Sequence, residues 1–174
     1  MTDDVRLRPV AHVIGGRPEM YEDHWYGTRA VIRLDDRFEP SALQGLPEFS
    51  HVEIVFRFDR IDERDVRVQP RPPRGNPDGP PVGVFAHRGP YRPNRLGVSV
   101  CRLIAVHGRD LHVADLDALD GTPVLDIKPY LVEFAPLDPV RQPGWATRLM
   151  KEYYVTSRSA AGADCAGAPG RRAL

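Results

Sequence analysis

Prolines and glycines recur along the whole chain, and they limit how long any regular helix can be. The sequence of 174 residues holds 18 prolines and 15 glycines. Proline inside a helix removes a backbone donor and clashes with the preceding turn, and both residue types favour turns. We therefore expect a mainly β fold built from short strands that are joined by turns.

The clearest strand pattern covers residues 52–61, where apolar and polar side chains alternate. A period of two is typical of a strand with one buried face. Shorter runs predict further strands at 5–14, 29–34, 82–86, 97–106, 111–114 and 123–127. Many short strands in one domain favour a single compact β-barrel. Helical patterns are confined to 40–46 and 145–154, and we expect short helices there.

Two segments do not suit a sheet interior. Residues 68–81 are rich in proline, which removes ladder donors, so we expect a stiff, exposed loop. Residues 156–174 contain almost no bulky apolar side chain, so disorder is expected. The predicted organisation is a barrel domain over 1–136, a helical extension over 137–155 and a disordered tail over 156–174.

The balance of charges and the two cysteines indicate which partners and which cellular compartment are expected for the protein. Lys and Arg number 24, as do Asp and Glu, so any contact with a polyanion needs a local patch. Cys101 and Cys165 do not form a disulfide framework, which suits a reducing cytoplasm. No secretory signal or apolar run of about 18 residues is present. We expect a soluble, cytoplasmic protein with no membrane contact.

The common catalytic motifs are missing from the sequence. The six histidines lack the spacing of metal ligands, so no metal is expected. A phosphate-binding loop, a nucleophile elbow and a dinucleotide-binding glycine fingerprint are also absent.

The first segment that could carry chemistry is GVFAHRGPYRPNRLG, residues 83–97. Its glycines and prolines favour a preformed loop, and its arginines could grip a carboxylate or phosphate through two parallel hydrogen bonds. A surface hairpin with solvated arginines explains the same residues.

The second segment is DALDGTPVLDIKPY, residues 117–130. Asp120 and Gly121 predict a turn before a strand that carries Asp126 and Lys128. These two charges are two residues apart and so share one face of the strand. They could line a ligand site at a barrel mouth, or form an ion pair on the outer face, which would contribute little to stability.

Together with QGLPEFSHVEIVFRFDR (44–60) and the opening VAHVIGG, these two segments resemble the TrmO family, also called YaeB or TsaA-like. The resemblance spans roughly the first three-quarters of the chain. It implies a β-barrel that binds S-adenosyl-L-methionine without a Rossmann sheet, as a homodimer. It further implies methylation of N6 of threonylcarbamoyladenosine at position 37, in the tRNA anticodon loop.

The resemblance also assigns roles to residues. A cofactor pocket is implied for Asp59, Arg60, Arg88, Arg92, Asn94, Leu96, Asp117, Leu119, Asp120, Gly121, Thr122 and Lys128. Apart from these assignments, we expect contacts to the substrate at His24, Trp25, Tyr91, Arg95 and Tyr130. Within the pocket, Arg88 is expected to hold the methionine carboxylate and Asp120 a ribose hydroxyl or the amino group. Asp126 and His87 are the candidate general bases, because a carboxylate or imidazole can accept the proton that the nitrogen loses.

Several positions depart from the family pattern. His87-Arg88-Gly89-Pro90 and Arg92-Pro93-Asn94-Arg95 stand where T-R-S-P and R-P-N-P are common, and Asp59-Arg60 stand in place of His-Gln. Residues 21–25 replace a Q-P-G element. The chain is expected to be a divergent short member without the C-terminal domain of many bacterial relatives. These departures bear on the substrate more than on the cofactor.

One local feature of the sequence bears on RNA binding. Residues 57–95 hold nine arginines against five acids, a patch that could contact phosphates, while Tyr91 or Trp25 could stack on an unpaired base. A solvated loop face is the alternative. Three functions therefore remain open: an RNA N-methyltransferase, a methyltransferase of the same fold for a small-molecule acceptor, and a non-catalytic module that binds S-adenosyl-L-methionine.

Overall fold

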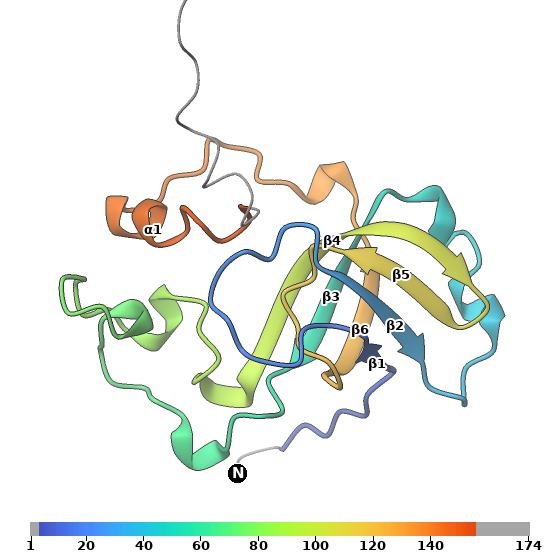
Figure 1. Ribbon diagram of the computed structural model, residues 1–174, viewed down its shortest axis with the longest axis horizontal. Coiled ribbons are helices and arrows are strands. Elements are labelled where there is room, and N and C mark those ends of the chain that lie inside the picture. Colours follow the sequence, from blue (N-terminus) through green and yellow to red (C-terminus); the bar gives the residue numbers. More distant parts are fainter. Residues whose placement is uncertain (1–3, 156–174) are drawn as a thin grey trace, which may run out of the picture.

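The computed structural model describes residues 4–155, and the tail predicted over 156–174 lies outside them. The predicted β-barrel is confirmed. Six strands close into a barrel in the order β1-β2-β5-β4-β3-β6 (Figure 1), and each neighbouring pair is antiparallel. The strands are β1 (Ala11–Ile14), β2 (Arg29–Leu34), β3 (His51–Arg57), β4 (Leu96–His107), β5 (Asp110–Ala114) and β6 (Pro123–Pro129).

Helices are short, as expected. The single α-helix among residues 4–155 is α1 (Gly144–Leu149). The 3-10 turns are η1 (Pro40–Leu43), η2 (Leu46–Glu48), η3 (Glu63–Asp65), η4 (Pro73–Gly75), η5 (Val84–Ala86), η6 (Pro93–Arg95) and η7 (Val132–Phe134). The helix predicted over 40–46 is reduced to η1, because Gln44 is already extended. The helix predicted over 145–154 ends at Leu149.

The strand predicted at 82–86 is wrong. Val82 pairs only with Arg71 in an isolated bridge, and the chain then turns into η5, where the Ala86 amide donates to the Gly83 carbonyl at 2.9 Å. The loop 68–81 is also less exposed than predicted. Pro73 is buried, and the side chain of Arg74 is only 19% exposed because it pairs with Asp23 and Glu22.

The barrel interior holds the core. Val52, Ile54 and Phe56 of β3 are each at most 2% exposed, and the residues between them are more exposed, as the alternation predicted. Burying a side chain of this size stabilises the fold by about 1.5–3 kcal/mol. The other core side chains come from every strand and from the segments next to β2 and β5: Ala11, Val13, Ala30, Ile32, Leu34, Leu43, Cys101, Leu111, Val113, Leu116, Ala118 and Val124.

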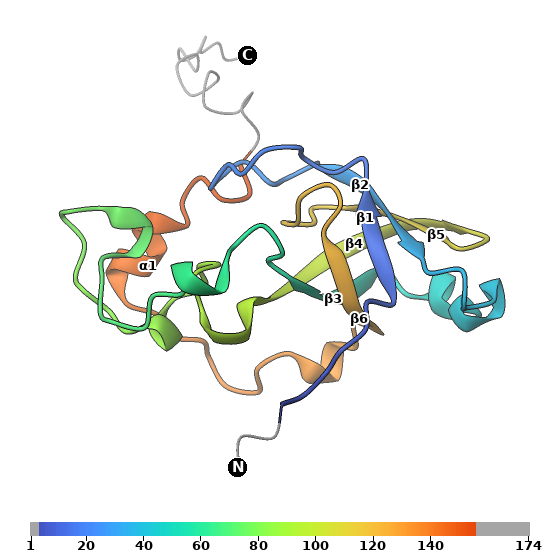
Figure 2. The same cartoon turned by 90° about the horizontal axis from the view of Figure 1, so that it is seen from below.

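β4 positions the connections that matter for function. It is 12 residues long, pairs with β3 along its first half and with β5 along its second, and follows directly on the loop 83–95. Figures 1 and 2 show α1 beside the loops of residues 60–95, on one side of the barrel, with η1 and η2 on the other. Within residues 4–155 no helix has the length and apolar character needed to cross a membrane.

Candidate functional site

Four segments meet near the start of β4. They are the loop 83–95, β4 itself, the connection from β5 to β6 and the residues that follow α1. They contribute five side chains, which we call the Asp117 cluster: Arg88, Ser99, Asp117, Tyr153 and Tyr154. The Tyr153 hydroxyl donates a hydrogen bond to Oδ2 of Asp117, and the rings of the two tyrosines pack edge to face with centroids 4.9 Å apart.

Other members of the cluster act on the pKa of Tyr154. Burial raises the pKa of Tyr154 to about 12, and the carboxylates of Asp117 and Asp115 add to this, while Arg88 and Ser99 act in the opposite direction. Burial, followed by the charge of Asp117, also raises the pKa of Tyr153. Both phenols therefore stay protonated at neutral pH and can act as hydrogen-bond donors.

Two polar atoms of the cluster are buried without a partner. Oδ1 of Asp117 and Oγ of Ser99 make no hydrogen bond of good geometry within the described residues, although Ser99 is only 4% exposed. A buried polar group without a partner costs about 1–3 kcal/mol. A ligand that supplied hydrogen-bonding groups to these two oxygens would therefore gain the most binding free energy there.

Arg88 is partly engaged by the backbone. Its Nη2 donates to the Val98 carbonyl at 2.6 Å, which fixes the guanidinium beside β4. This is its only hydrogen bond to residues 4–155. Since a guanidinium carries five N–H donors, Arg88 retains donors for an anionic group.

The remaining arginines of the loop hold its backbone. Arg92 donates to the His87 carbonyl at 3.1 Å, and Arg95 donates to the Ile61 carbonyl at 2.7 Å. Asn94 and Arg95 have left-handed backbone angles, with φ of 62° and 54°. The loop is thus preformed, as predicted, but Arg92 and Arg95 are used inside it. Leu96, which begins β4, is 36% exposed.

The turn after Asp117 is also fixed by internal bonds. Oδ1 of Asp120 accepts from the Gly15 amide at 2.8 Å, and Gly121 has a φ of 83° that favours glycine. Arg60 donates to the carbonyls of Pro18 and Asp120, at 2.5 and 2.8 Å. Asp120 and Arg60 therefore tie the loop at 15–18 to the turn. Thr122 is buried, Leu119 is half-buried and Asp59 is exposed.

His87 lies on the same loop as Arg88. Burial, followed by the charges of Arg71 and Arg92, lowers the pKa of its imidazole. Its Nε2 is buried and has no partner within residues 4–155. The Gly89 amide donates to its Nδ1 at 3.3 Å, so the proton of the neutral imidazole lies on Nε2, which can donate a hydrogen bond to a ligand.

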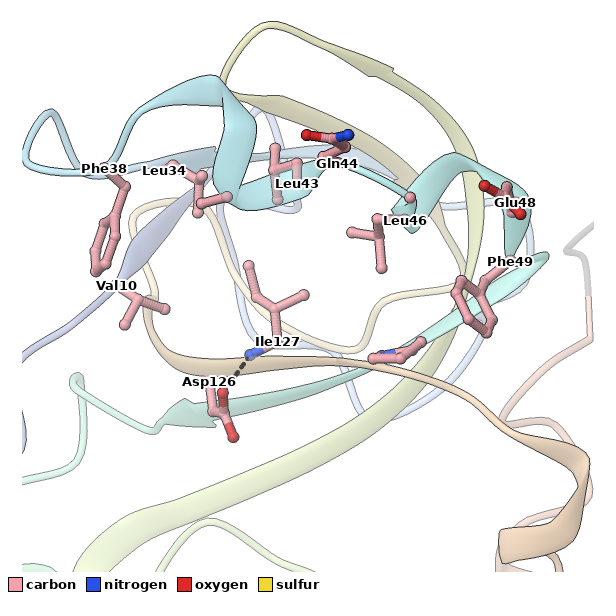
Figure 3. A pocket seen from close by; sticks show the side chains of 13 residues that line it. Val10, Leu34, Phe38, Leu43, Gln44, Leu46, Glu48, Phe49, Asp126 and Ile127 are labelled. Atoms are coloured by element: carbon pink, nitrogen blue, oxygen red, sulfur yellow. Dashed lines mark hydrogen bonds between the residues drawn. The ribbon is translucent and has the colours of Figure 1, made fainter.

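Asp126 and Lys128 form an ion pair with each other. Their side chains are 48% and 58% exposed, and Ile127, between them, packs against the core. The pair therefore matches the outer-face alternative. Asp126 borders a groove of about 520 Å³ between β6 and the η1–η2 segment (Figure 3). No hydrogen bond or ion pair within the described chain links it to the Asp117 cluster.

The residues predicted to contact a substrate differ in how far they are open to solvent. Trp25 is 5% exposed, and the Arg17 guanidinium lies 4.2 Å from its ring centroid, which leaves no open face for a base. His24 has a φ of 64°, and its Nδ1 lies 3.0 Å from the Val155 carbonyl oxygen. Tyr91 is 39% exposed beside Arg71. Tyr130 is half-buried at the end of β6.

Reasoning from the sequence missed Ser99, Tyr153 and Tyr154. Ser99 gave a weak signal, since a serine at an inward position of an apolar strand is unusual. The two tyrosines carry no motif, and they approach Asp117 only through the path of the chain after α1. In this part of the chain, residues 4–155, no group of acidic, histidine or cysteine side chains is arranged to hold a metal ion.

Residues 22–135 match the family model of the tRNA-methyltransferase O N-terminal domain. The chain is 38% identical over 119 residues to a human tRNA (adenine(37)-N6)-methyltransferase, covering 67% of this chain and 26% of the human protein. It is 43% identical over 103 residues to a Pyrococcus abyssi protein named "Probable S-adenosyl-L-methionine-binding protein", covering 59% of this chain and 53% of that one. The chain thus spans about a quarter of the human relative.

The fold is also similar to a solved structure. A crystal structure of TrmO from Pseudomonas aeruginosa superposes with a TM-score of 0.68 at 28% sequence identity. The similarity covers 83% of this chain and 63% of that one.

Proposed function

The chain belongs to the family of the tRNA-methyltransferase O N-terminal domain, and from this premise we propose that it transfers a methyl group from S-adenosyl-L-methionine to N6 of the adenine at position 37 of tRNA. The names of the human and archaeal relatives support the reaction and the cofactor respectively. The finer proposal is that the acceptor is threonylcarbamoyladenosine, as the TrmO-like segments imply.

The observation that carries the proposal is the placement of two opposite charges beside the tyrosines: Arg88 is held on β4 by the Val98 carbonyl, and Asp117 accepts from Tyr153, whose ring packs on Tyr154. The methionine part of the cofactor bears a carboxylate and an ammonium group, and its ribose bears hydroxyls. Arg88 has free donors for the carboxylate, while Oδ1 of Asp117 can accept from the ammonium group or a hydroxyl. A site with one cation and one anion suits such a zwitterion.

Methyl transfer depends mainly on how the enzyme positions the cofactor and the acceptor nitrogen. Methyl transfer from a sulfonium requires in-line approach of the nitrogen, so holding both reactants in register supplies most of the rate enhancement. Neither candidate base is free to take the proton: Nδ1 of His87 already accepts from the Gly89 amide, which leaves the ring proton of the neutral imidazole on its buried Nε2. Asp126 is already paired with Lys128.

We expect the anticodon loop to bind to arginines whose side chains make no hydrogen bond to a backbone carbonyl within the described residues. Arg60, Arg92 and Arg95 are tied to carbonyls, whereas Arg64 is 83% exposed beside Asp62. Arg57 and Arg67 complete this outward group. We propose that these three contact phosphates, which fix register without reading sequence.

We also propose a homodimer that works in the cytoplasm. The outward side chains of β4 form a largely apolar stripe, with Leu96, Val98, Val100 and Ile104 between 36% and 44% exposed. Arg102, which is paired with Asp115, interrupts the stripe between Val100 and Ile104. Apolar stripes of this kind are typical of interaction surfaces, and a two-fold axis would let the stripe pack on itself. Within residues 4–155 the thiol of Cys101 has no disulfide partner, which suits a reducing compartment.

Calorimetry followed by methyl transfer tests the proposal. The protein should bind S-adenosylhomocysteine and should transfer a labelled methyl group to tRNA that carries threonylcarbamoyladenosine. Transfer should fall steeply as salt rises, since phosphate contacts release counterions. Absence of cofactor binding would overturn the methyltransferase assignment. Binding with label in small molecules alone would favour the alternative acceptor, and binding without any transfer would favour a non-catalytic module.

A further inference from the structure

The residues after α1 are packed against the Asp117 cluster by specific contacts. The His24 amide donates to the Glu152 carbonyl at 3.1 Å, and the Trp25 amide donates to the Tyr153 carbonyl at 2.8 Å. Nδ1 of His24 adds a contact to the Val155 carbonyl. We call residues 152–155 the tyrosine segment. The tyrosine segment is a turn that two backbone hydrogen bonds from His24 and Trp25 hold against the loop 15–28, so its side chains have defined positions.

The loop that holds the tyrosine segment is itself fixed by the side chains of two arginines. The Arg17 guanidinium donates to the Asp23 carbonyl at 2.8 Å and also to the His24 carbonyl, and it stacks on Trp25. The Arg74 side chain pairs with Asp23 at 2.8 Å and reaches to 5.9 Å from the Tyr153 ring centroid. Two arginines thus hold the backbone to which Tyr153 is bonded.

Tyr153 determines which carboxylate oxygen of Asp117 is available to a ligand. One carboxylate oxygen, Oδ2, accepts the Tyr153 hydroxyl, and the other, Oδ1, is buried without a partner. A carboxylate held by one oxygen cannot rotate freely, and it offers its second oxygen to a single N–H or O–H donor. Because that oxygen is out of solvent contact, ligand entry must shift a neighbouring side chain. Tyr154, which is 46% exposed and packs edge to face on Tyr153, is the neighbouring side chain that borders solvent.

We propose that the tyrosine segment completes the cofactor site, with Tyr153 as the positioning residue for Asp117. This inference rests on the proposed function and extends it beyond the matched domain, since the family model ends at residue 135. The role belongs to the hydroxyl of Tyr153 and acts through Asp117. Tyr153 itself need not touch the cofactor.

A double-mutant cycle on the affinity for S-adenosylhomocysteine tests the proposal. Tyr153→Phe should weaken binding about tenfold, the loss expected for one hydrogen bond to a charged group. In an Asp117→Ala background, which leaves the Tyr153 hydroxyl no acceptor at this position, the same change should weaken binding less than about twofold, because its effect passes through the carboxylate. Tyr26→Phe, an exposed tyrosine that makes no side-chain hydrogen bond within residues 4–155, is the matched control and should bind like the parent.

Equal losses in both backgrounds, or no loss in either, would overturn the positioning role while leaving the proposed function intact. Failure of the parent protein to bind would instead overturn the proposed function and this inference with it. Hydrogen exchange of the unaltered protein gives a second measurement that does not depend on a variant folding. The cofactor product should protect peptides covering 115–122 and 150–155 together, and protection of the first alone would refute the inference.

Discussion

Gly97 of β4 lies directly opposite Phe56 of β3, so close that a Cβ atom at Gly97 would fall 2.5 Å from Cε2 of the Phe56 ring. Phe56 is 2% exposed and packs edge to face on Phe58. The ring therefore fills the space that any other residue at position 97 would need. This contact joins the core to the start of the strand that carries Ser99.

Gly97→Ala should destabilise the protein by about 1–3 kcal/mol, because an added methyl group must displace a packed ring. Urea unfolding measures the change. Gly83→Ala is the control, since its Cβ would meet nothing within 4 Å and its φ of −65° suits alanine. A variant at position 97 as stable as the parent would show that Phe56 can move aside.

Arg88→Lys should keep the fold and weaken binding of the cofactor about tenfold or more. Lysine cannot donate at once to the Val98 carbonyl and to a carboxylate in the fork geometry of arginine. Calorimetry with S-adenosylhomocysteine measures the loss, and Arg64→Lys, at an exposed site, should bind normally. Equal affinities for both variants would remove Arg88 from the site.

Val100→Glu should turn the proposed dimer into a monomer, because two buried carboxylates would face each other across a two-fold contact. Light scattering at micromolar concentration gives the mass. Val132→Glu, at a side chain that is 75% exposed outside the stripe, should leave the mass unchanged. A parent protein that is already monomeric would contradict the dimer.

His87 should make stability depend on pH. Its pKa is lowered on folding, chiefly by burial, so below the ordinary value of 6.5 the unfolded chain binds a proton that the folded chain resists. This group therefore costs no stability at pH 8 and costs progressively more as pH falls through 6.5. His87→Gln should lose less stability than the parent between pH 8 and pH 5.5, as measured by urea midpoints. His12→Gln, an exposed control, should behave as the parent does.

Cys101 should be inert towards alkylation in the folded protein. Burial is the main cause that raises its pKa to about 12, with Asp117 and Asp115 contributing, so almost no thiolate exists at pH 8. Iodoacetamide should modify the peptide that contains Cys101 only after denaturant is added, as read by mass spectrometry. Modification without denaturant would mean that β4 opens readily.

The sequence by itself determined the barrel. Alternation in β3 is a local property, and Asp120-Gly121 form the predicted turn before β6. The bounds were less well predicted, since β1 begins only at Ala11 and β3 already ends at Arg57, although strands were predicted over 5–14 and 52–61. The TrmO-like segments also predicted that the loop at 83–97 and the turn at 117–122 lie near each other, and both contribute to the Asp117 cluster.

Tertiary structure alone decided which polar groups face one another. The pairing of β3 with β6 shifts register between Val55 and Phe56, so Ile127 packs on the core and Asp126 stays outside. An irregularity of this kind breaks the period-two count that sequence reasoning depends on. Tyr153 meets Asp117 across 36 residues, and Arg88 reaches a backbone carbonyl of β4. Such contacts depend on the path of loops, and no periodic pattern of side chains encodes that path.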